Sequence, residues 1–85
     1  MRLDEVVSVK VSGPHRLSVR FADGVSGEVE FRDSFFRGVF EPLRDPALFS
    51  AVHCAQGFVE WPGDLDLAPD AMHVELRRNG RWVLE

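Results

Sequence analysis

The sequence predicts an α+β fold: a small antiparallel β-meander and a second short hairpin, covered by short helical segments and one C-terminal helix. Three observations predict it. Apolar and polar residues alternate through the first third of the chain, aromatic residues interrupted by glycine and proline fill the middle, and helical spacing appears near the end. With 85 residues, 45% of them hydrophobic, the chain can bury one small core. We therefore expect a single domain over residues 1–85, with residues 77–85 as a C-terminal tail.

Three strands are predicted between residues 6 and 31. Their apolar residues alternate with serine, lysine, arginine and glutamate, which is the period of a strand with one buried face. These apolar residues are Val7, Val9, Val11, Leu17, Val19, Phe21, Val25, Val29 and Phe31. Turn sequences at 12–14 and 22–24 separate the segments, so consecutive strands should pair as an antiparallel meander.

The length of the second turn follows from keeping the apolar residues on one face. A two-residue loop would turn the apolar residues of the third strand toward solvent. A three-residue loop, 22–24, pairs Leu17 with Val29 and places its glycine at the left-handed position of a type I turn with a G1 bulge. The polar face then carries Arg16 opposite Glu30, which is typical of the solvated side of an antiparallel sheet.

The stretch from residue 31 to residue 49 has aromatic residues and leucine at three- to five-residue spacing. One glycine and two prolines interrupt it, which predicts short helical turns over the apolar face of the sheet instead of one long helix. Asp45 followed by Pro46 predicts a helix that begins with an aspartate cap and a proline in its first turn. An aromatic ring left exposed here would be a candidate interface for a partner or a second copy. The candidates are Phe35, Phe36, Phe40 and Phe49.

A second hairpin is predicted from Ala51 to Trp61, around a three-residue loop at 55–57 that ends in glycine. Cys54 follows His53 here, which raises the possibility of a thiol–imidazole pair. Neighbouring residues of a strand point to opposite faces, so the strand prediction excludes that pair.

The C-terminal helix is predicted from Pro69 to Arg78, because Met72 and Leu76 are spaced to stack on one face. Asn79-Gly80 would cap its end. Residues 82–84 should then fold back as a short apolar tail.

The acidic stretch before this helix matches a calcium-binding loop in part. Asp64, Asp66 and Glu75 occupy the first, third and twelfth positions of the template. Pro69 stands where the template requires glycine for a sharp turn, and its ring fixes a negative φ. Calcium binding of this kind is therefore not predicted.

Two interpretations of Asp66, Asp70 and His73 stay open. As a metal-binding or hydrolytic site, they would use the shared helix face of Asp70 and His73, which are three residues apart. As structural residues, Asp66 would accept hydrogen bonds from free N–H groups at the helix start, and Asp70 would favour the positive end of the helix. The pattern is too short to assign a catalytic residue, a metal ligand or a cofactor.

Composition narrows the possible partners and the compartment. The formal net charge of -4 argues against general nucleic-acid binding, although Arg77, Arg78 and Arg81 cluster at the helix end. No run approaches the ~18 apolar residues of a membrane span, and the first residues lack the long apolar stretch of a signal peptide. A single cysteine forms no internal disulfide, so we expect a cytoplasmic protein.

Three segments, VRFADG, VFEPLRDPALF and EWPGDLDLAPDAMH, resemble the bacterial family catalogued as domain of unknown function 2442. The resemblance runs from about Leu3 to His73 and is most specific in the last segment. The residues that carry it are Phe21, Asp23, Gly24, Phe40, Leu43, Asp45, Phe49, Trp61, Pro62, Asp66, Pro69 and Asp70. The chain departs from the family where Gly63-Asp64 replaces the usual Asn or Asp followed by Gly.

The resemblance implies a strand-rich α+β domain with no established activity. Some members are fused to a helix-turn-helix domain, and others resemble partners of a second small protein in toxin–antitoxin-like pairs. This chain has no room for a helix-turn-helix after residue 76, so DNA binding by that route is not expected.

We therefore predict a non-enzymatic protein-interaction module. It could be an antitoxin-like partner of a small protein, either a neighbouring-gene product or a second copy, and would bind through the aromatic residues at 35–49 or a sheet edge. The first alternative is a small metal-binding or hydrolytic enzyme using Asp66, Asp70 and His73. The second is a regulatory ligand- or nucleic-acid-binding domain using the arginines at the helix end.

Overall fold

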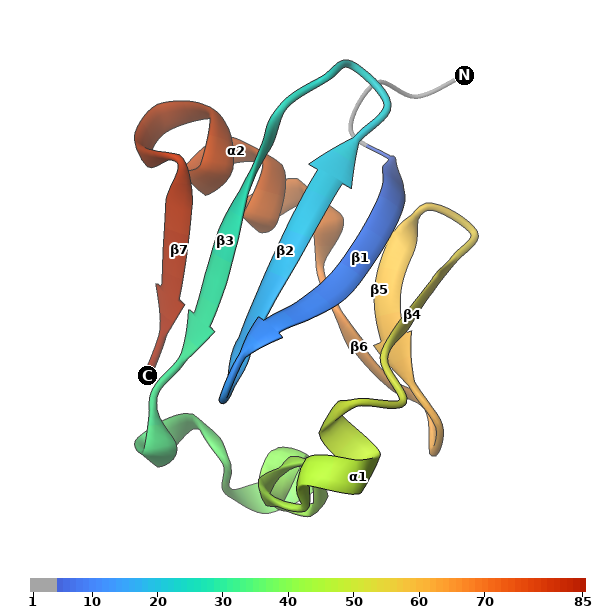
Figure 1. Ribbon diagram of the computed structural model, residues 1–85, viewed down its shortest axis with the longest axis vertical. Coiled ribbons are helices and arrows are strands. Elements are labelled where there is room, and N and C mark those ends of the chain that lie inside the picture. Colours follow the sequence, from blue (N-terminus) through green and yellow to red (C-terminus); the bar gives the residue numbers. More distant parts are fainter. Residues whose placement is uncertain (1–4) are drawn as a thin grey trace.

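The computed structural model describes residues 5–85 and contains a four-stranded sheet, a three-stranded sheet and several helices (Figure 1). The larger sheet consists of β1 (Val6–Gly13), β2 (Arg16–Phe21), β3 (Ser26–Phe31) and β7 (Arg81–Leu84), in the order β1-β2-β3-β7. The first three strands form the predicted antiparallel meander. The predicted α+β class is confirmed.

The predicted register of β2 and β3 is confirmed. Leu17 pairs with Val29 and Arg16 pairs with Glu30 across the two strands. The three-residue loop 22–24 closes the hairpin, with Gly24 at φ +92°. The need to keep the apolar side chains on one face was therefore enough to choose the loop length.

Strand β1 differs from its predicted alternation at its first residues. Val6 pairs with Phe21 and Ser8 with Arg20, so Val7 is the extra residue of a β-bulge. The bulge shifts the side-chain alternation by one residue, and Val6 becomes buried while Val7 is 53% exposed. The prediction that Val7 faces the core is wrong for this reason.

The predicted C-terminal tail is a strand of the main sheet. Helix α2 (Pro69–Asn79) ends at Gly80, which has a left-handed φ of +73°, and β7 then runs parallel to β3. Gly27 in β3 permits this close approach, because a Cβ at that position would lie 2.3 Å from the carbonyl oxygen of Gly80. The same carbonyl accepts a hydrogen bond from the backbone N–H of Glu28 at 3.2 Å.

The smaller sheet has three strands, β4 (His53–Ala55), β5 (Phe58–Trp61) and β6 (Leu65–Leu67), in the order β4-β5-β6. The predicted three-residue loop in its first hairpin is wrong. Ala55 pairs with Phe58, so the loop is the two-residue Gln56-Gly57, and both residues have positive φ, 54° and 87°. This is the conformation of a type I′ turn.

Short helices connect the two sheets, as predicted. They are η1 (Asp33–Phe35), η2 (Gly38–Arg44) and α1 (Pro46–Phe49), of which the first two are 3₁₀ helices. The Asp45 carboxylate caps α1 by accepting a hydrogen bond from the backbone N–H of Ala47 at 3.0 Å. The predicted aspartate cap and first-turn proline of this helix are confirmed.

Arg44 ties these connecting helices together. Its guanidinium group donates to the carbonyl of Phe36 and to the Asp33 carboxylate, at 3.0 and 2.7 Å. It also lies 6.0 Å from the centre of the Phe36 ring. Several donors of one planar group therefore join η1, the residue that follows it and the end of η2.

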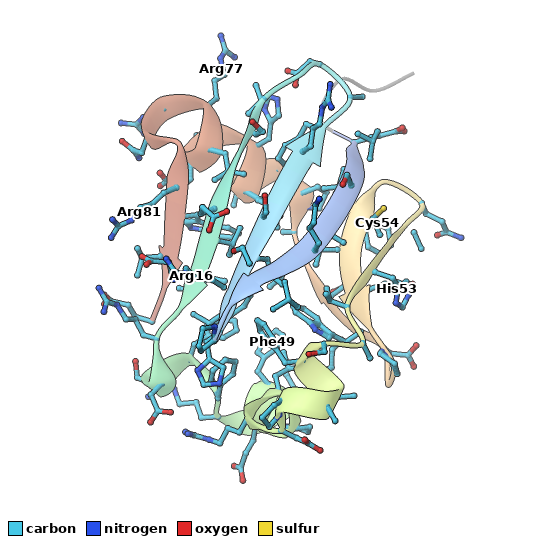
Figure 2. The ribbon with its side chains drawn as sticks, in the orientation of Figure 1. Arg16, Phe49, His53, Cys54, Arg77 and Arg81 are labelled. Carbon is cyan, nitrogen blue, oxygen red and sulfur yellow. The ribbon has the colours of Figure 1, made fainter. Side chains whose placement is uncertain are left out.

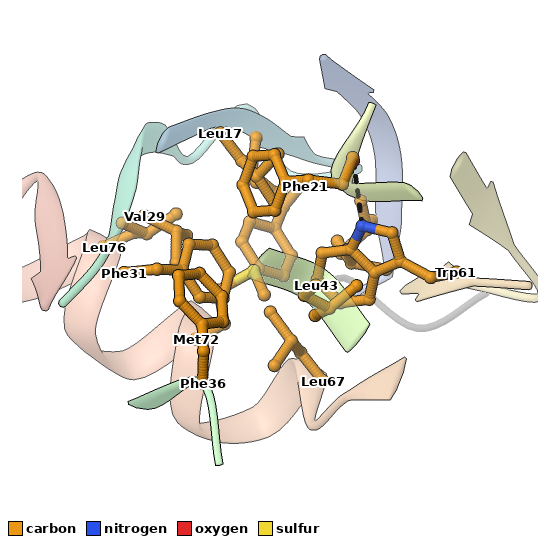
Figure 3. Close-up of a cluster of buried hydrophobic side chains, with 14 residues drawn as sticks. Leu17, Phe21, Val29, Phe31, Phe36, Leu43, Trp61, Leu67, Met72 and Leu76 are labelled. Atoms are coloured by element: carbon orange, nitrogen blue, oxygen red, sulfur yellow. Dashed lines mark hydrogen bonds between the residues drawn. The ribbon is translucent and has the colours of Figure 1, made fainter. Parts of the chain in front are cut away.

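The core lies between the larger sheet on one side and the smaller sheet, the connecting helices and α2 on the other. Helix α2 crosses behind β2 and β3 in the view of Figure 1. Figure 3 shows its closely packed rings and aliphatic side chains. Among the described residues, the buried set is Val6, Leu17, Val19, Phe21, Val29, Phe31, Phe36, Leu43, Phe49, Val59, Trp61, Leu67, Met72 and Leu76. The predicted stacking of Met72 and Leu76 toward the core is confirmed.

Candidate functional site

The sequence-predicted signature residues around the C-terminal helix have different environments. Trp61 is 1% exposed, and its indole Nε1–H donates to the carbonyl oxygen of Phe49 at 3.0 Å (Figure 3). Pro62 is exposed and begins the turn between β5 and β6. Pro69 is the first residue of α2, and Asp70 lies in the first turn. Trp61 therefore fixes the packing of α1 against the smaller sheet.

Asp66 does not have the predicted role at the start of the helix. It is an exposed residue of β6 and pairs with Glu60 of β5. The residue that precedes the helix is Ala68, which makes no side-chain capping bond. Residues 65–67 form a strand that pairs with β5, and this pairing places Asp66 opposite Glu60.

His73 lies beside a carboxylate that the sequence did not connect with it. Its Nε2 is 2.9 Å from Oδ2 of Asp23, in the turn between β2 and β3. The ring of His73 also packs edge-on against Phe21, with 4.9 Å between ring centres. The hydrogen bond from His73 and a second one from the backbone N–H of Val25 lower the pKa of Asp23. Both side chains are mostly covered, 14% and 23% exposed.

The chemistry available to this pair is limited. A carboxylate can orient a histidine, but hydrolysis also requires a nucleophile or an activated water. Within residues 5–85, no group of three or more histidine, cysteine, aspartate or glutamate residues could hold a metal ion. His73 is paired with Asp23, and Asp66 lies on β6 opposite Glu60, so the contacts between described side chains do not join Asp66 to His73.

His53 and Cys54 point to opposite faces of β4, as the strand prediction requires. His53 is exposed, and its Nε2 lies 2.9 Å from Oε1 of Glu60 on the neighbouring strand. That hydrogen bond raises the pKa of His53. Cys54 pairs with the buried Val59 and packs against the core (Figure 2). The two residues cannot form a thiol–imidazole pair in this arrangement.

The four candidate interface phenylalanines belong largely to the core. Phe36 and Phe49 are 0% and 3% exposed, and Phe35 and Phe40 are half-buried against the same cluster. Phe35 and Phe40 pack against each other, with 4.7 Å between ring centres. Val39, which lies between Phe35 and Phe40 in sequence, is 71% exposed. The aromatic segment therefore presents the edges of two rings and one valine, and no broad aromatic surface.

The comparison with protein families matches residues 6–77 to the model described as "Protein of unknown function (DUF2442)". The chain belongs to the DUF2442 family. The match covers most of the chain and includes the three signature segments that carry the resemblance in sequence. No curated protein and no solved structure matches the chain.

In this DUF2442 domain, the family-like segments converge on one packing unit. The hairpin segment supplies Asp23, and the last segment supplies its partner His73. The middle segment supplies the Phe49 carbonyl, and the last supplies the indole of Trp61 that binds it. The signatures thus hold the two sheets and α2 together.

The DUF2442 domain has a hollow of about 370 Å³ at the end of the larger sheet near α1. Its lining is mainly apolar and includes Val11, Pro14, Pro46 and Phe49. His15 also lines it, with a left-handed φ of 54° and its ring 4.7 Å from that of Phe36. His15 is therefore held by ring packing in a conformation that non-glycine residues seldom adopt.

Strand β7 leaves the opposite side of the sheet open. The carbonyl groups of Gly80 and Leu84 accept hydrogen bonds from Glu28 and Arg32, on the β3 side. Because backbone groups alternate in direction along a strand, those of Arg81 and Val83 point away from β3. Within the described chain, no strand lies beyond β7 (Figure 1).

Side chains at this edge are partly exposed. The side chain of Arg81 is 58% exposed, and its Nη2 lies 3.1 Å from Oε2 of Glu30. Arg77 and Arg78 are exposed at the end of α2, so the predicted arginine group is divided between a helix end and a sheet edge (Figure 2). A second hollow of about 360 Å³ separates the end of α2 from β7.

None of the helices in the described part is long and apolar enough to span a bilayer.

Proposed function

We propose that this DUF2442 domain is a non-enzymatic protein-interaction module that binds a protein partner by strand addition at β7. The observation that carries the proposal is the outward direction of the backbone groups of Arg81 and Val83 at an open edge. Such groups pair readily with an extended segment of another chain. Strand β7 contains no proline and no lysine, two residues that commonly block an edge.

The opposite edge of the sheet supports this choice of site. The backbone N–H of Val6, in β1, donates to the carbonyl of Gly57 in the smaller sheet at 2.8 Å. The loop of the smaller sheet therefore covers part of the β1 edge. The β7 edge has no comparable cover among the described residues.

Affinity capture from native lysate tests the proposal. The Val83→Pro variant removes an outward N–H and adds a ring at the edge, where proline does not break a bond to β3. Val83→Thr keeps that N–H and is the matched control. We expect the wild-type chain and Val83→Thr to retain the same small protein, identified by mass spectrometry, and Val83→Pro to lose it. Equal retention by all three chains, or none beyond a tag-only control, would contradict the proposal.

An antitoxin-like role is the finer form of this proposal, and the family resemblance is its support. Its test is co-expression with the product of the neighbouring gene. We expect growth arrest by that product to be relieved by the wild-type chain and by Val83→Thr, but not by Val83→Pro. A neighbouring product that is harmless when expressed alone would rule out the antitoxin-like role while leaving strand addition intact.

A further inference from the structure

We infer that a second copy of this chain occupies the β7 edge, pairing β7 antiparallel with β7 of the partner subunit about a two-fold axis at Val83. The inference rests on the proposed function, because it uses the same edge and specifies the partner. It predicts one continuous sheet across two copies.

The backbone at this edge selects the register. Arg81 and Val83 direct their backbone groups outward. Extending the alternation one residue past the end of β7 gives Glu85 the same direction. In an antiparallel pair, the two residues that exchange hydrogen bonds must both face the partner strand. Centring the axis on Val83 places Val83 opposite itself and Arg81 opposite Glu85 of the partner subunit. A shift by one residue would place outward groups opposite inward ones.

The charges on the outer face of the sheet agree with this register. Arg81 and Glu85 are both exposed, and the two-fold axis brings each opposite the other twice. Arg81 keeps donors available beside its contact with Glu30, since a guanidinium group has five N–H bonds. Opposite charges directly across antiparallel strands stabilise the pair, and like charges destabilise it.

The side chains on the core side of β7 also match across the proposed two-fold axis. Trp82 and Leu84 point to the core side of the sheet, where they pack against its margin and remain half-exposed. The same register places Trp82 opposite Leu84 of the partner subunit, so each apolar side chain would cover the other. The hollow beside β7 is lined by Glu75 and Asn79 of α2 and by Trp82, and it leaves room next to the indole ring.

The rest of the sheet explains why assembly should stop at two copies. A head-to-tail contact would need a second open edge and would extend into a filament. The β1 edge is partly covered by the loop of the smaller sheet, through the bond from Val6 to Gly57. A two-fold pair of β7 strands uses one edge of each copy and closes the assembly.

Sedimentation equilibrium of the purified chain tests the inference. We expect a monomer–dimer equilibrium between about 10 µM and about 1 mM, the range of weak protein–protein affinities. Val83→Pro should be monomeric throughout, and Val83→Thr should dimerise like the wild-type chain. Urea unfolding of each variant at low concentration checks that the monomer remains folded.

Charge exchange tests the register. Glu85→Arg places two arginines opposite each other, and Arg81→Glu places two glutamates opposite each other, so each should weaken dimerisation by about tenfold. The double variant restores opposite charges across the axis and should recover most of the loss. Added salt should weaken the wild-type dimer and strengthen either single variant.

A monomer at every concentration, or a dimer that Val83→Pro leaves unchanged, would overturn the inference. A dimer that the double variant fails to rescue would overturn the register centred on Val83. If the purified chain stays monomeric but Val83→Pro loses a protein from lysate, the second copy is wrong and strand addition by a different protein stands. If neither assay responds to Val83→Pro, both proposals fail.

Discussion

The carboxylate of Asp23 makes two contacts that differ in how well the sequence predicts them. Oδ1 accepts a hydrogen bond from the backbone N–H of Val25 at 3.0 Å, which belongs to the local turn. Oδ2 lies 2.9 Å from His73, which is 50 residues away. The turn contact follows from neighbouring residues and the glycine that ends the loop. The contact with His73 depends on how α2 packs across the sheet, and no local pattern contains that information.

Replacing Asp23 by asparagine should reduce stability in a pH-dependent way. Its hydrogen bonds lower the pKa of Asp23 in the folded state below the ordinary value of 3.8. The charged carboxylate therefore stabilises the folded state at pH values above 3.8, and this contribution is lost as pH falls through the pKa of the folded state. We expect Asp23→Asn to lower the urea midpoint at about pH 5 and to differ less from wild type as pH falls below that range. Asp66→Asn, at an exposed strand position, is the control. A deficit that stays constant with pH would show that the charge is not involved.

His53 should respond in the opposite direction. The hydrogen bond to Glu60 raises the pKa of His53 above 6.5 in the folded state. The bond therefore stabilises the folded protein fully at pH values below the pKa of His53 in the unfolded chain, and this contribution is lost as pH rises through the pKa in the folded state. Glu60→Gln should lower the pKa of His53 toward 6.5, measured by NMR titration of the imidazole. An unchanged midpoint for His53 would mean that Glu60 does not hold it in solution.

At the scale of elements, predictability follows how local each interaction is. The meander and the short helix after Asp45 depend on neighbouring residues, and their predictions are confirmed. Strand β7 pairs with β3, which lies some fifty residues earlier in the chain. It has only four residues, three of them consecutive apolar ones, and such a short run without alternation predicts a packed tail as well as it predicts a strand. The bulge at Val7 is similar, because only the pairing with β2 reveals that one residue is extra.

Gly27 is the element-scale residue whose substitution should cost most among the strand glycines. A Cβ there would meet the backbone carbonyl of Gly80, which cannot move without displacing β7 from β3. We expect Gly27→Ala to reduce the free energy of unfolding by about 1–3 kcal/mol, as overpacking does. Gly13→Ala is the matched control, because its Cβ would meet only the movable end of the Arg16 side chain, at 3.0 Å. Equal urea midpoints for the two variants would contradict the close approach.

In the molecule as a whole, two sheets pack against each other through side chains from segments that are distant in sequence. The fold class could be predicted because composition and alternation average over many residues. The number of strands in each sheet could not, because β6 and β7 are short and become strands only through their partners. The same holds for the candidate site. The sequence predicts sites at Asp66 and in the aromatic segment, whereas the open edge of β7 is created only by the pairing of β7 with β3.

Amide hydrogen exchange measures this organisation directly. Strands β2 and β3 each have a neighbouring strand on both sides, so their amides should exchange slowest. In β7, the amides of Trp82 and Leu84 face β3 and should be protected, whereas those of Arg81 and Val83 face outward and should exchange fast at protein concentrations too low for copies to pair. Fast exchange at all four positions would show that residues 81–84 are a tail in solution, and the open edge would then belong to β3. Alternating protection along β7 would place the edge, and the binding chemistry proposed for it, at Arg81 and Val83.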